Sequence, residues 1–249
     1  MFLRLTAILV CSLITLPAAI AQELSGDYLY KVSTIRAATG ELSGLLKWIA
    51  ELKESNYFEM ANEHPALVMR HSQGDQWDLL IITPMESWTN YHSETATSAR
   101  DEAMGEHSDL LAPGYDLIAF DEDQFAYGPS VDVVMAAYEA NDFYHIEMFE
   151  AAPGKAGELF GQRRMENAYL AATGQTTNMI FRRAAGSDVD VFTIGFHKSL
   201  EAFAAPASAT DEEKEAAAKA AGFKDRADIS FYLRSLLSGH HDTLAVKVE

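Results

Sequence analysis

The chain has 249 residues, of which 37 are acidic and 19 are basic, so its formal net charge is −18. This acidity argues against a nucleic-acid binder, because such proteins neutralise phosphates with an excess of lysine and arginine. It also argues against a polybasic membrane-surface protein. A hydrophobic fraction of 48% is ordinary for a globular protein, and the length suits one large domain or two of roughly 100 residues.

Residues 1–21 are predicted to be a secretory signal peptide. Arg4 precedes an apolar run over 5–20, and the segment ends in the small-x-small pattern Ala19-Ile20-Ala21. The run is shorter than the roughly 20 apolar residues that a spanning helix needs, and Pro17 interrupts it. Cleavage would also remove the single cysteine, Cys11. We therefore expect a periplasmic or secreted protein with no disulfide, no cysteine-ligated metal and no integral membrane segment.

The rest of the chain is predicted to be a duplication, because matching residues recur in the same order at a nearly constant separation. The first repeat is expected over 22–120, a connection over 121–141, and the second repeat over 142–249. Polar residues that occur in both copies are interpreted as structural, for example as turn caps. The paired positions are Tyr30 with Tyr144, Gly40 with Gly154, Arg70 with Arg182, Asp78 with Asp190, Ser87 with Ser199, and Asp116 with Asp242.

Both repeats show the same order of predicted elements. A strand with alternating apolar residues comes first, a helix follows, and two strands separated by a glycine turn come next. Ser87 and Ser199 are predicted N-caps of a second helix, and a last strand closes each repeat. The expected strands are 28–36, 67–72, 77–84 and 115–120, and then 142–150, 178–184, 189–196 and 241–248. The Ala-rich segment 206–228 is an extra helix or flap of the second repeat. The order β-α-β-β-α-β is ferredoxin-like, in the α+β class.

Two segments of the second repeat carry a family resemblance. Residues 144–149 with the turn Pro153-Gly154-Lys155, and the segment from Phe192 to Leu200, resemble NIPSNAP-like members of the dimeric α/β-barrel superfamily. In the first repeat Thr39 stands where that turn has its proline. The resemblance implies two sheets packed face to face, usually across a homodimer. A tandem copy would build this α/β barrel within one chain. The superfamily includes cofactor-free monooxygenases, cyclases and haem enzymes, so it sets no single chemistry.

Strand alternation predicts which side chains meet. We expect Tyr144, Ile146 and Met148 to face the helices, which leaves His145 and Glu147 toward a cavity between the sheets. In the ferredoxin-like order the opening strand lies between the third and fourth strands, so His145 should lie close to His197.

The candidate catalytic residues and candidate ligand-binding residues follow from this placement. Histidine and carboxylate on one sheet face suit a general acid/base pair or a divalent metal, and a satisfied structural pair is the third explanation. We predict no metal site. His240 and His241 are adjacent and should point to opposite faces, so joint chelation is not expected. The catalytic candidates are His145, Glu147 and His197, and the ligand-binding candidates are Lys31, Tyr115, Thr193 and His241.

The leading functional hypothesis is an exported soluble protein that binds a small apolar or aromatic ligand between its sheets. The alternative is a cofactor-free or haem-dependent oxidoreductase of the monooxygenase kind that uses the candidate catalytic residues. A third hypothesis is a non-catalytic interaction protein whose acidic surface meets a cationic partner. The sequence has no phosphate-binding loop, nucleophile elbow or haem-attachment motif. The cofactor therefore stays open between none and haem.

Overall fold

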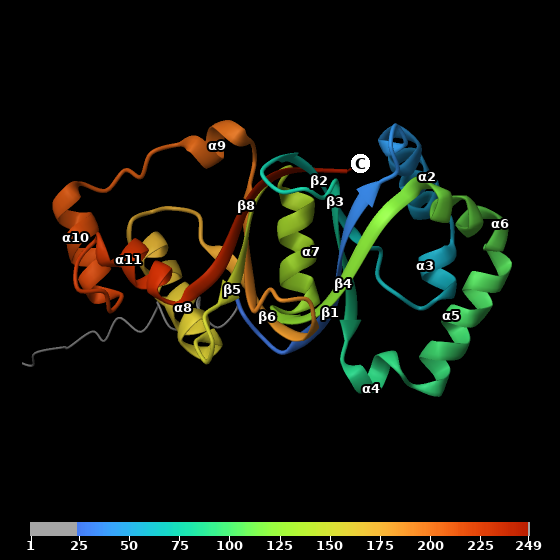
Figure 1. Ribbon diagram of the computed structural model, residues 1–249, viewed down its shortest axis with the longest axis horizontal. Helices are drawn as coiled ribbons and strands as arrows, with labels where there is room; N and C mark the ends of the chain where they lie inside the picture. Colours follow the sequence, from blue (N-terminus) through green and yellow to red (C-terminus); the bar gives the residue numbers. More distant parts are fainter. Residues whose placement is uncertain (1–23, 249) are drawn as a thin grey trace, which may run out of the picture.

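The computed structural model describes residues 24–248, so the signal peptide predicted for 1–21 lies outside the described residues. The described chain forms a closed antiparallel barrel with helices on its outside (Figure 1). Its strands are β1 (Tyr28–Ala37), β2 (Leu67–Gln73), β3 (Leu79–Glu86), β4 (Ile118–Gly128), β5 (Phe143–Ala151), β6 (Asn178–Gly186), β7 (Val191–His197) and β8 (Leu237–Lys247).

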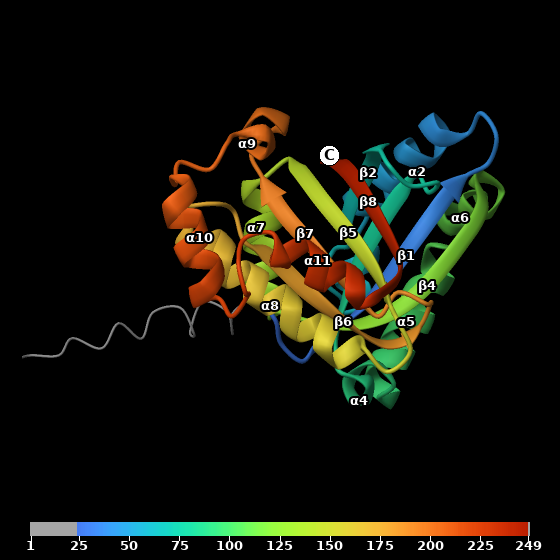
Figure 2. The same ribbon diagram turned by 60° about the vertical axis from the view of Figure 1, so that its left-hand side comes forward.

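Helices of the first repeat lie on one side of the barrel and helices of the second repeat on the other (Figures 1 and 2). The first group is α2 (Leu42–Glu54), α3 (Tyr57–Met60), α4 (Trp88–Tyr91), α5 (Glu94–Glu106), α6 (Ser108–Leu111) and the 3-10 helix η1 (Ala112–Leu117). The second group is α8 (Ala156–Ala172), α9 (Leu200–Ala204), α10 (Asp211–Ala220) and α11 (Asp228–Ser235). Helix α7 (Val131–Ala140) joins the repeats. No helix in residues 24–248 is long and apolar enough to cross a membrane.

The strand order confirms the predicted fold class. Each repeat contributes a four-stranded sheet, in the order β4-β1-β3-β2 and β8-β5-β7-β6, and β1 and β5 lie between their repeat's third and fourth strands. The sheets join where β2 pairs with β8 and β6 pairs with β4. Two ferredoxin-like repeats therefore close into one α/β barrel within a single chain, which leaves no open sheet edge.

Paired residues of the two repeats make the same contacts. Asp78 Oδ2 accepts a hydrogen bond from Ala37 N at 2.8 Å, and Asp190 Oδ2 accepts one from Ala151 N at 2.8 Å. These contacts tie the end of each opening strand to the start of the third strand. Ser87 and Ser199 cap α4 and α9 through their side chains, as predicted. These contacts support the structural interpretation of the repeated polar residues.

Two glycines allow the sheets to close on each other. Gly74 and Gly186 both have positive φ, of 123° and 78°, a conformation that residues with a side chain rarely adopt. A Cβ at Gly74 would lie 2.1 Å from Asp242 O on β8, and one at Gly186 would lie 2.6 Å from Asp123 O on β4. Each glycine thus lets the edge strand of one repeat approach the last strand of the other.

The segment between the repeats differs from the expectation. Residues 121–141 were expected as a connection, yet they hold most of β4 and all of α7. The fourth strand also begins later than 115, because Pro113 and Gly114 lie in the 3-10 helix η1. The pairing partner of Ser33 is Asp123, as that of Glu147 is Asp242. The residue equivalent to Asp242 is therefore Asp123, not Asp116.

The barrel interior shows that the predicted assignment of faces was wrong. Tyr144, Ile146 and Met148 belong to one buried cluster with residues of both repeats, so they point into the barrel instead of toward helices. Phe149 packs outward against Leu159 of α8. The reason is physical: a closed barrel excludes water from every side of its interior, whereas helices cover the outer face only in part. The more apolar face therefore turns inward.

Helix α7 closes one end of the barrel. Tyr138 stacks on Tyr144 with ring centroids 5.7 Å apart. Its hydroxyl donates to Val68 O at 2.8 Å and accepts from Val68 N at 3.2 Å. The opposite end of the barrel is open.

Candidate functional site

A pocket of about 300 Å³ lies on the outer face of the second sheet, between that sheet, the carboxyl end of α8 and helix α9. We call it the sheet–helix pocket. All three candidate catalytic residues are among its lining residues, and Phe203 of α9 lies over the two histidines. The sequence thus predicted which side chains converge, but placed them inside the barrel instead of outside it.

The two histidines meet as the register predicted. His145 pairs with Gly195, two residues before His197, on the neighbouring strand β7. Ring centroids of His145 and His197 lie 5.0 and 5.2 Å from that of Phe203. A Cβ at Gly195 would lie 2.9 Å from His197 Nε2, so this glycine makes room for the imidazole. Burial, together with the charge of His145, lowers the pKa of His197, so its ring is neutral at neutral pH.

Glu147 is a buried carboxylate with several partners. Its Oε2 lies 3.3 Å from Arg163 Nη1 and accepts a hydrogen bond from Thr193 Oγ1 at 3.2 Å. Its Oε1 lies 3.7 Å from His240 Nε2. Burial alone would raise the pKa of Glu147, but His240, Arg163 and His145 together hold that pKa below its usual value. Glu147 is therefore ionised at neutral pH. Thr193, a candidate ligand-binding residue, contacts this carboxylate.

Arg163 lies under the sheet, although the pair Arg163-Arg164 looks like solvated surface in the sequence. Its side chain is 1% exposed and lies between α8 and the sheet, with its guanidinium carbon 4.7 Å from the centroid of the Phe149 ring. It also pairs with Glu166, and its Nε donates to Gln162 Oε1 at 2.8 Å. One signal was available in the sequence: Arg163 follows Leu159 by four residues, so both lie on one face of α8.

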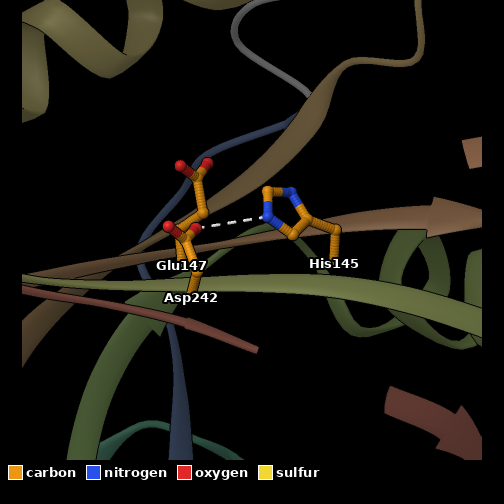
Figure 3. Close-up of side chains that lie close together, drawn as sticks. All are labelled: His145, Glu147 and Asp242. Atoms are coloured by element: carbon orange, nitrogen blue, oxygen red, sulfur yellow. Dashed lines mark hydrogen bonds and ion pairs between the residues drawn. The ribbon is translucent and has the colours of Figure 1, made fainter. Parts of the chain in front are cut away.

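Figure 3 shows His145, Glu147 and Asp242 close together on this face. His145 Nε2 lies 3.3 Å from Asp242 Oδ1, and His240 Nε2 lies 3.6 Å from the same oxygen. We call these four residues, His145, Glu147, His240 and Asp242, the His–acid cluster. His145 and then His240 lower the pKa of Asp242, against the effect of burial. The sequence analysis missed His240 and Asp242 because it placed His145 and Glu147 on the cavity side with His241, whereas they share the outer face with His240 and Asp242.

The open end of the barrel forms a second and larger cavity, of about 670 Å³, which we call the barrel mouth. It lies between the two sheets, where the leading hypothesis expected a ligand. Trp77 and Phe120 give it aromatic surface, and His241 lines it from β8. His241 is thus the one candidate ligand-binding residue that faces the cavity between the sheets.

Two other candidate ligand-binding residues lie elsewhere. Lys31 is on the outer face of the first repeat, where its Nζ lies 2.8 Å from Asp123 Oδ2. Tyr115 is in the 3-10 helix η1 and is 82% exposed. Neither residue lines the sheet–helix pocket or the barrel mouth, so the structure contradicts their assignment to a common site. The cause is the same reversal of faces for Lys31, and the later start of β4 for Tyr115.

Neither cavity has the lining that a haem group needs. Haem carries two anionic propionates, which call for cationic partners. Among the described residues that line the sheet–helix pocket, the charged groups are two acids, Glu147 and Glu166, and there is no lysine or arginine. The barrel mouth offers Arg36 against four carboxylates, those of Asp75, Glu122, Glu150 and Asp188. The haem-dependent alternative does not fit these residues.

Comparison with known proteins supports the fold. No protein-family model and no curated protein matches the sequence. Among solved structures, an anthrone oxidase-like protein is 14% identical with a TM-score of 0.57, and the match covers 92% of this chain and 94% of that one. A candidate monooxygenase from Lactobacillus acidophilus NCFM is 9% identical with a TM-score of 0.51, covering 90% and 95%. A candidate monooxygenase from Fusobacterium nucleatum is 9% identical with a TM-score of 0.52, covering 90% and 94%.

At such identities the likeness shows the fold alone. The chain shares the fold of these proteins over about nine-tenths of its length. The fold that the sequence resemblance implied is thereby confirmed.

Proposed function

We propose that this protein is an oxidoreductase of the monooxygenase kind, which oxidises a small aromatic or apolar molecule in the sheet–helix pocket. The observation that carries the proposal is the convergence of His145, His197 and Phe203 on one pocket beside the buried carboxylate of Glu147. An aromatic wall favours a flat apolar molecule, and a neutral imidazole accepts a proton from it. The fold shared with an anthrone oxidase-like protein and two candidate monooxygenases agrees with this chemistry.

The reaction class follows from these groups. His197 takes a proton from an acidic methylene of the substrate, and the resulting carbanion passes electrons to dioxygen. The methylene becomes a carbonyl, and the second oxygen atom leaves as water. Dioxygen is the oxidant, and the balance requires no other reductant. His145 lies beside His197 under Phe203, with its Nε2 3.3 Å from Asp242 Oδ1.

The test uses anthrone as the probe, because it is a tricyclic ketone with an acidic methylene. Oxygen uptake is followed with an electrode, in the full chain and in three variants. We expect His197→Ala to lower the rate about 100-fold or more and Phe203→Ala to raise KM. His92→Ala, an exposed histidine of the first repeat, should leave the rate unchanged. Equal activity in wild type and His197→Ala, or no anthrone turnover and no anthrone binding, would contradict the proposal.

Ligand binding at the barrel mouth is a second candidate function. A cavity of about 670 Å³ is within the range of small-molecule sites, and Trp77 reports on it. An aromatic ligand should quench the fluorescence of wild type but not of Trp77→Phe to the same extent. Equal quenching in both proteins would rule out the mouth as the binding site.

Three sequence predictions complete the proposal. The motifs of β5 and β7 support a NIPSNAP-like relationship, and the pattern of residues 1–21 supports export to the periplasm or medium. The superfamily resemblance supports a homodimer. Sequencing of the amino terminus after secretion tests export, and sedimentation of the purified protein tests the dimer.

A further inference from the structure

We propose that the His–acid cluster is a binding site for one divalent first-row transition metal, such as Zn²⁺, Mn²⁺ or Fe²⁺. The cluster shares His145 and Glu147 with the sheet–helix pocket. Its part in catalysis therefore rests on the function proposed above, whereas the binding of the metal stands on geometry alone.

The pairing of β5 with β8 places the four side chains together. Glu147 lies opposite Asp242, and His240 lies two residues before Asp242 on the same strand. His145 lies two residues before Glu147. Because alternate residues of a strand share a face, both pairs point outward toward α8. Neighbouring strands thus present two imidazoles and two carboxylates on the same outer face of the sheet.

The distances between the candidate ligand atoms suit a shared cation. His145 Nε2 and His240 Nε2 lie 3.3 and 3.6 Å from Asp242 Oδ1, and His240 Nε2 lies 3.7 Å from Glu147 Oε1. Metal–ligand bonds of about 2.1 Å in a tetrahedral site put neighbouring ligand atoms about 3.4 Å apart. Ligand atoms of His145, Glu147 and Asp242 all lie within 4.8 Å of one another.

The ring of His240 gives an independent observation. Its Nε2 is buried and has no hydrogen-bond partner among the described residues, although a buried polar atom normally has one. The ring is held flat against Phe149, with centroids 4.7 Å apart and an angle of 8° between the planes. That nitrogen faces two carboxylate oxygens at distances too long for hydrogen bonds. A metal ion between them would satisfy all three atoms.

The local charges also match a divalent ion. Arg163 pairs with both Glu147 and Glu166, so its single positive charge leaves the acids of this region in excess. Arg163 contacts Oε2 of Glu147, while Oε1 faces His240. A ligating carboxylate typically has such an outer hydrogen-bond partner on its second oxygen.

The first repeat shows what occupies the equivalent place when no metal is needed. There Lys31 stands at the position of His145, and Ser33 at that of Glu147. The ammonium of Lys31 lies 2.8 Å from Asp123 Oδ2, and Ser33 donates to Asp123 Oδ1 at 2.5 Å. The first repeat therefore supplies its own cation to the acid. The second repeat has two imidazoles there, which bind borderline metals well.

The test measures metal binding in the absence of substrate. The full chain is stripped with a chelator, and Zn²⁺ and Mn²⁺ are titrated in separately by calorimetry. We expect one ion per chain for at least one of the two metals. Asp242→Asn replaces a half-exposed carboxylate, and His240→Gln replaces an imidazole whose Nε2 has no hydrogen-bond partner among the described residues. Each change should weaken metal binding at least 10-fold. His241→Gln is the matched control, because this histidine is adjacent but faces the barrel mouth, and its affinity should equal that of wild type.

Thermal melting gives a second readout. Metal at a hundredfold excess over Kd should raise Tm by roughly 5–11 °C in wild type, and by less in Asp242→Asn. Absence of stoichiometric binding of either metal, or equal affinity in wild type and Asp242→Asn, would overturn the metal site. Anthrone oxidation is scored separately. Metal binding without anthrone turnover would refute the proposed function but not the metal site. Turnover without metal binding would refute the metal site but not the proposed function.

Discussion

Replacing Arg163 by methionine tests whether the buried charges behave as the geometry requires. The side chains of Arg163 and Glu147 are 1% and 13% exposed, and their nearest charged atoms lie 3.3 Å apart. Methionine keeps much of the apolar stem but removes the charge. Glu147 would then be left ionised and buried without its cation, which costs about 3–5 kcal/mol in comparable cases.

A double variant separates charge from packing. Arg163→Met combined with Glu147→Gln removes both charges at once, so we expect a loss below about 1.5 kcal/mol, well under that of the single change. Arg164→Met is the matched control. Arg164 is the next residue on α8 but is exposed, so its replacement should change stability by no more than about 0.5 kcal/mol.

The assay is urea unfolding at pH 7 in the presence of a chelator, with the midpoint and slope fitted for each protein. A buried, desolvated ion pair is contradicted if Arg163→Met costs no more stability than Arg164→Met, or if the double variant is as unstable as the single one. In the first case the ion pair would be mere surface electrostatics, and in the second the loss would come from packing.

The same variants predict a pH dependence. In wild type the pKa of Glu147 is below its usual value, so this group contributes stability above the unfolded pKa and loses it as pH falls through the folded pKa. In Arg163→Met the lowering effect of the guanidinium is lost and the folded pKa rises, so acidification costs this variant less stability than it costs wild type. The stability gap between the two proteins should therefore narrow as pH is lowered from 7 toward 4. A gap that widens would contradict this sign.

Three further changes test other parts of the structure. Gly74→Ala should lower the free energy of unfolding by about 2 kcal/mol or more, because a Cβ on this positive-φ residue would overlap the backbone of β8. Gly105→Ala, in open space on α5, should raise it by about 0.5–1 kcal/mol. A urea midpoint that moves the same way for both variants would refute the role assigned to Gly74. Gly195→Ala should weaken anthrone binding, because the added Cβ would displace the His197 imidazole. The circular dichroism spectrum should stay unchanged. Unchanged anthrone binding would contradict a contact between His197 and the ligand. Tyr138→Phe should cost about 1–3 kcal/mol in urea unfolding, because a buried strand N–H loses its partner, and a neutral result would mean that α7 is not anchored through this hydroxyl.

Local sequence patterns were sufficient for the elements and their order. Alternating apolar residues marked the strands, and the caps at Ser87 and Ser199 were predicted and found. The internal repeat then implied the ferredoxin-like pairing, because that topology places the opening strand between the third and fourth. From this pairing alone His145 and His197 were brought together correctly. Strands and helix caps depend on residues that are close in sequence, and the meeting of the two histidines depends only on the pairing of two strands within one repeat. These features can therefore be predicted from the sequence.

Which face of each sheet is inside was decided only by the tertiary structure. Both faces of β5 are apolar enough to be buried, and the choice depends on whether the sheet closes against its partner repeat or against helices. Closure through Gly74 and Gly186 turned the more apolar face inward and moved His145 and Glu147 outward beneath α8. Arg163 and His240 joined the site for the same reason. Contacts between elements far apart in the chain form only once the barrel has closed, so no local pattern could reveal them.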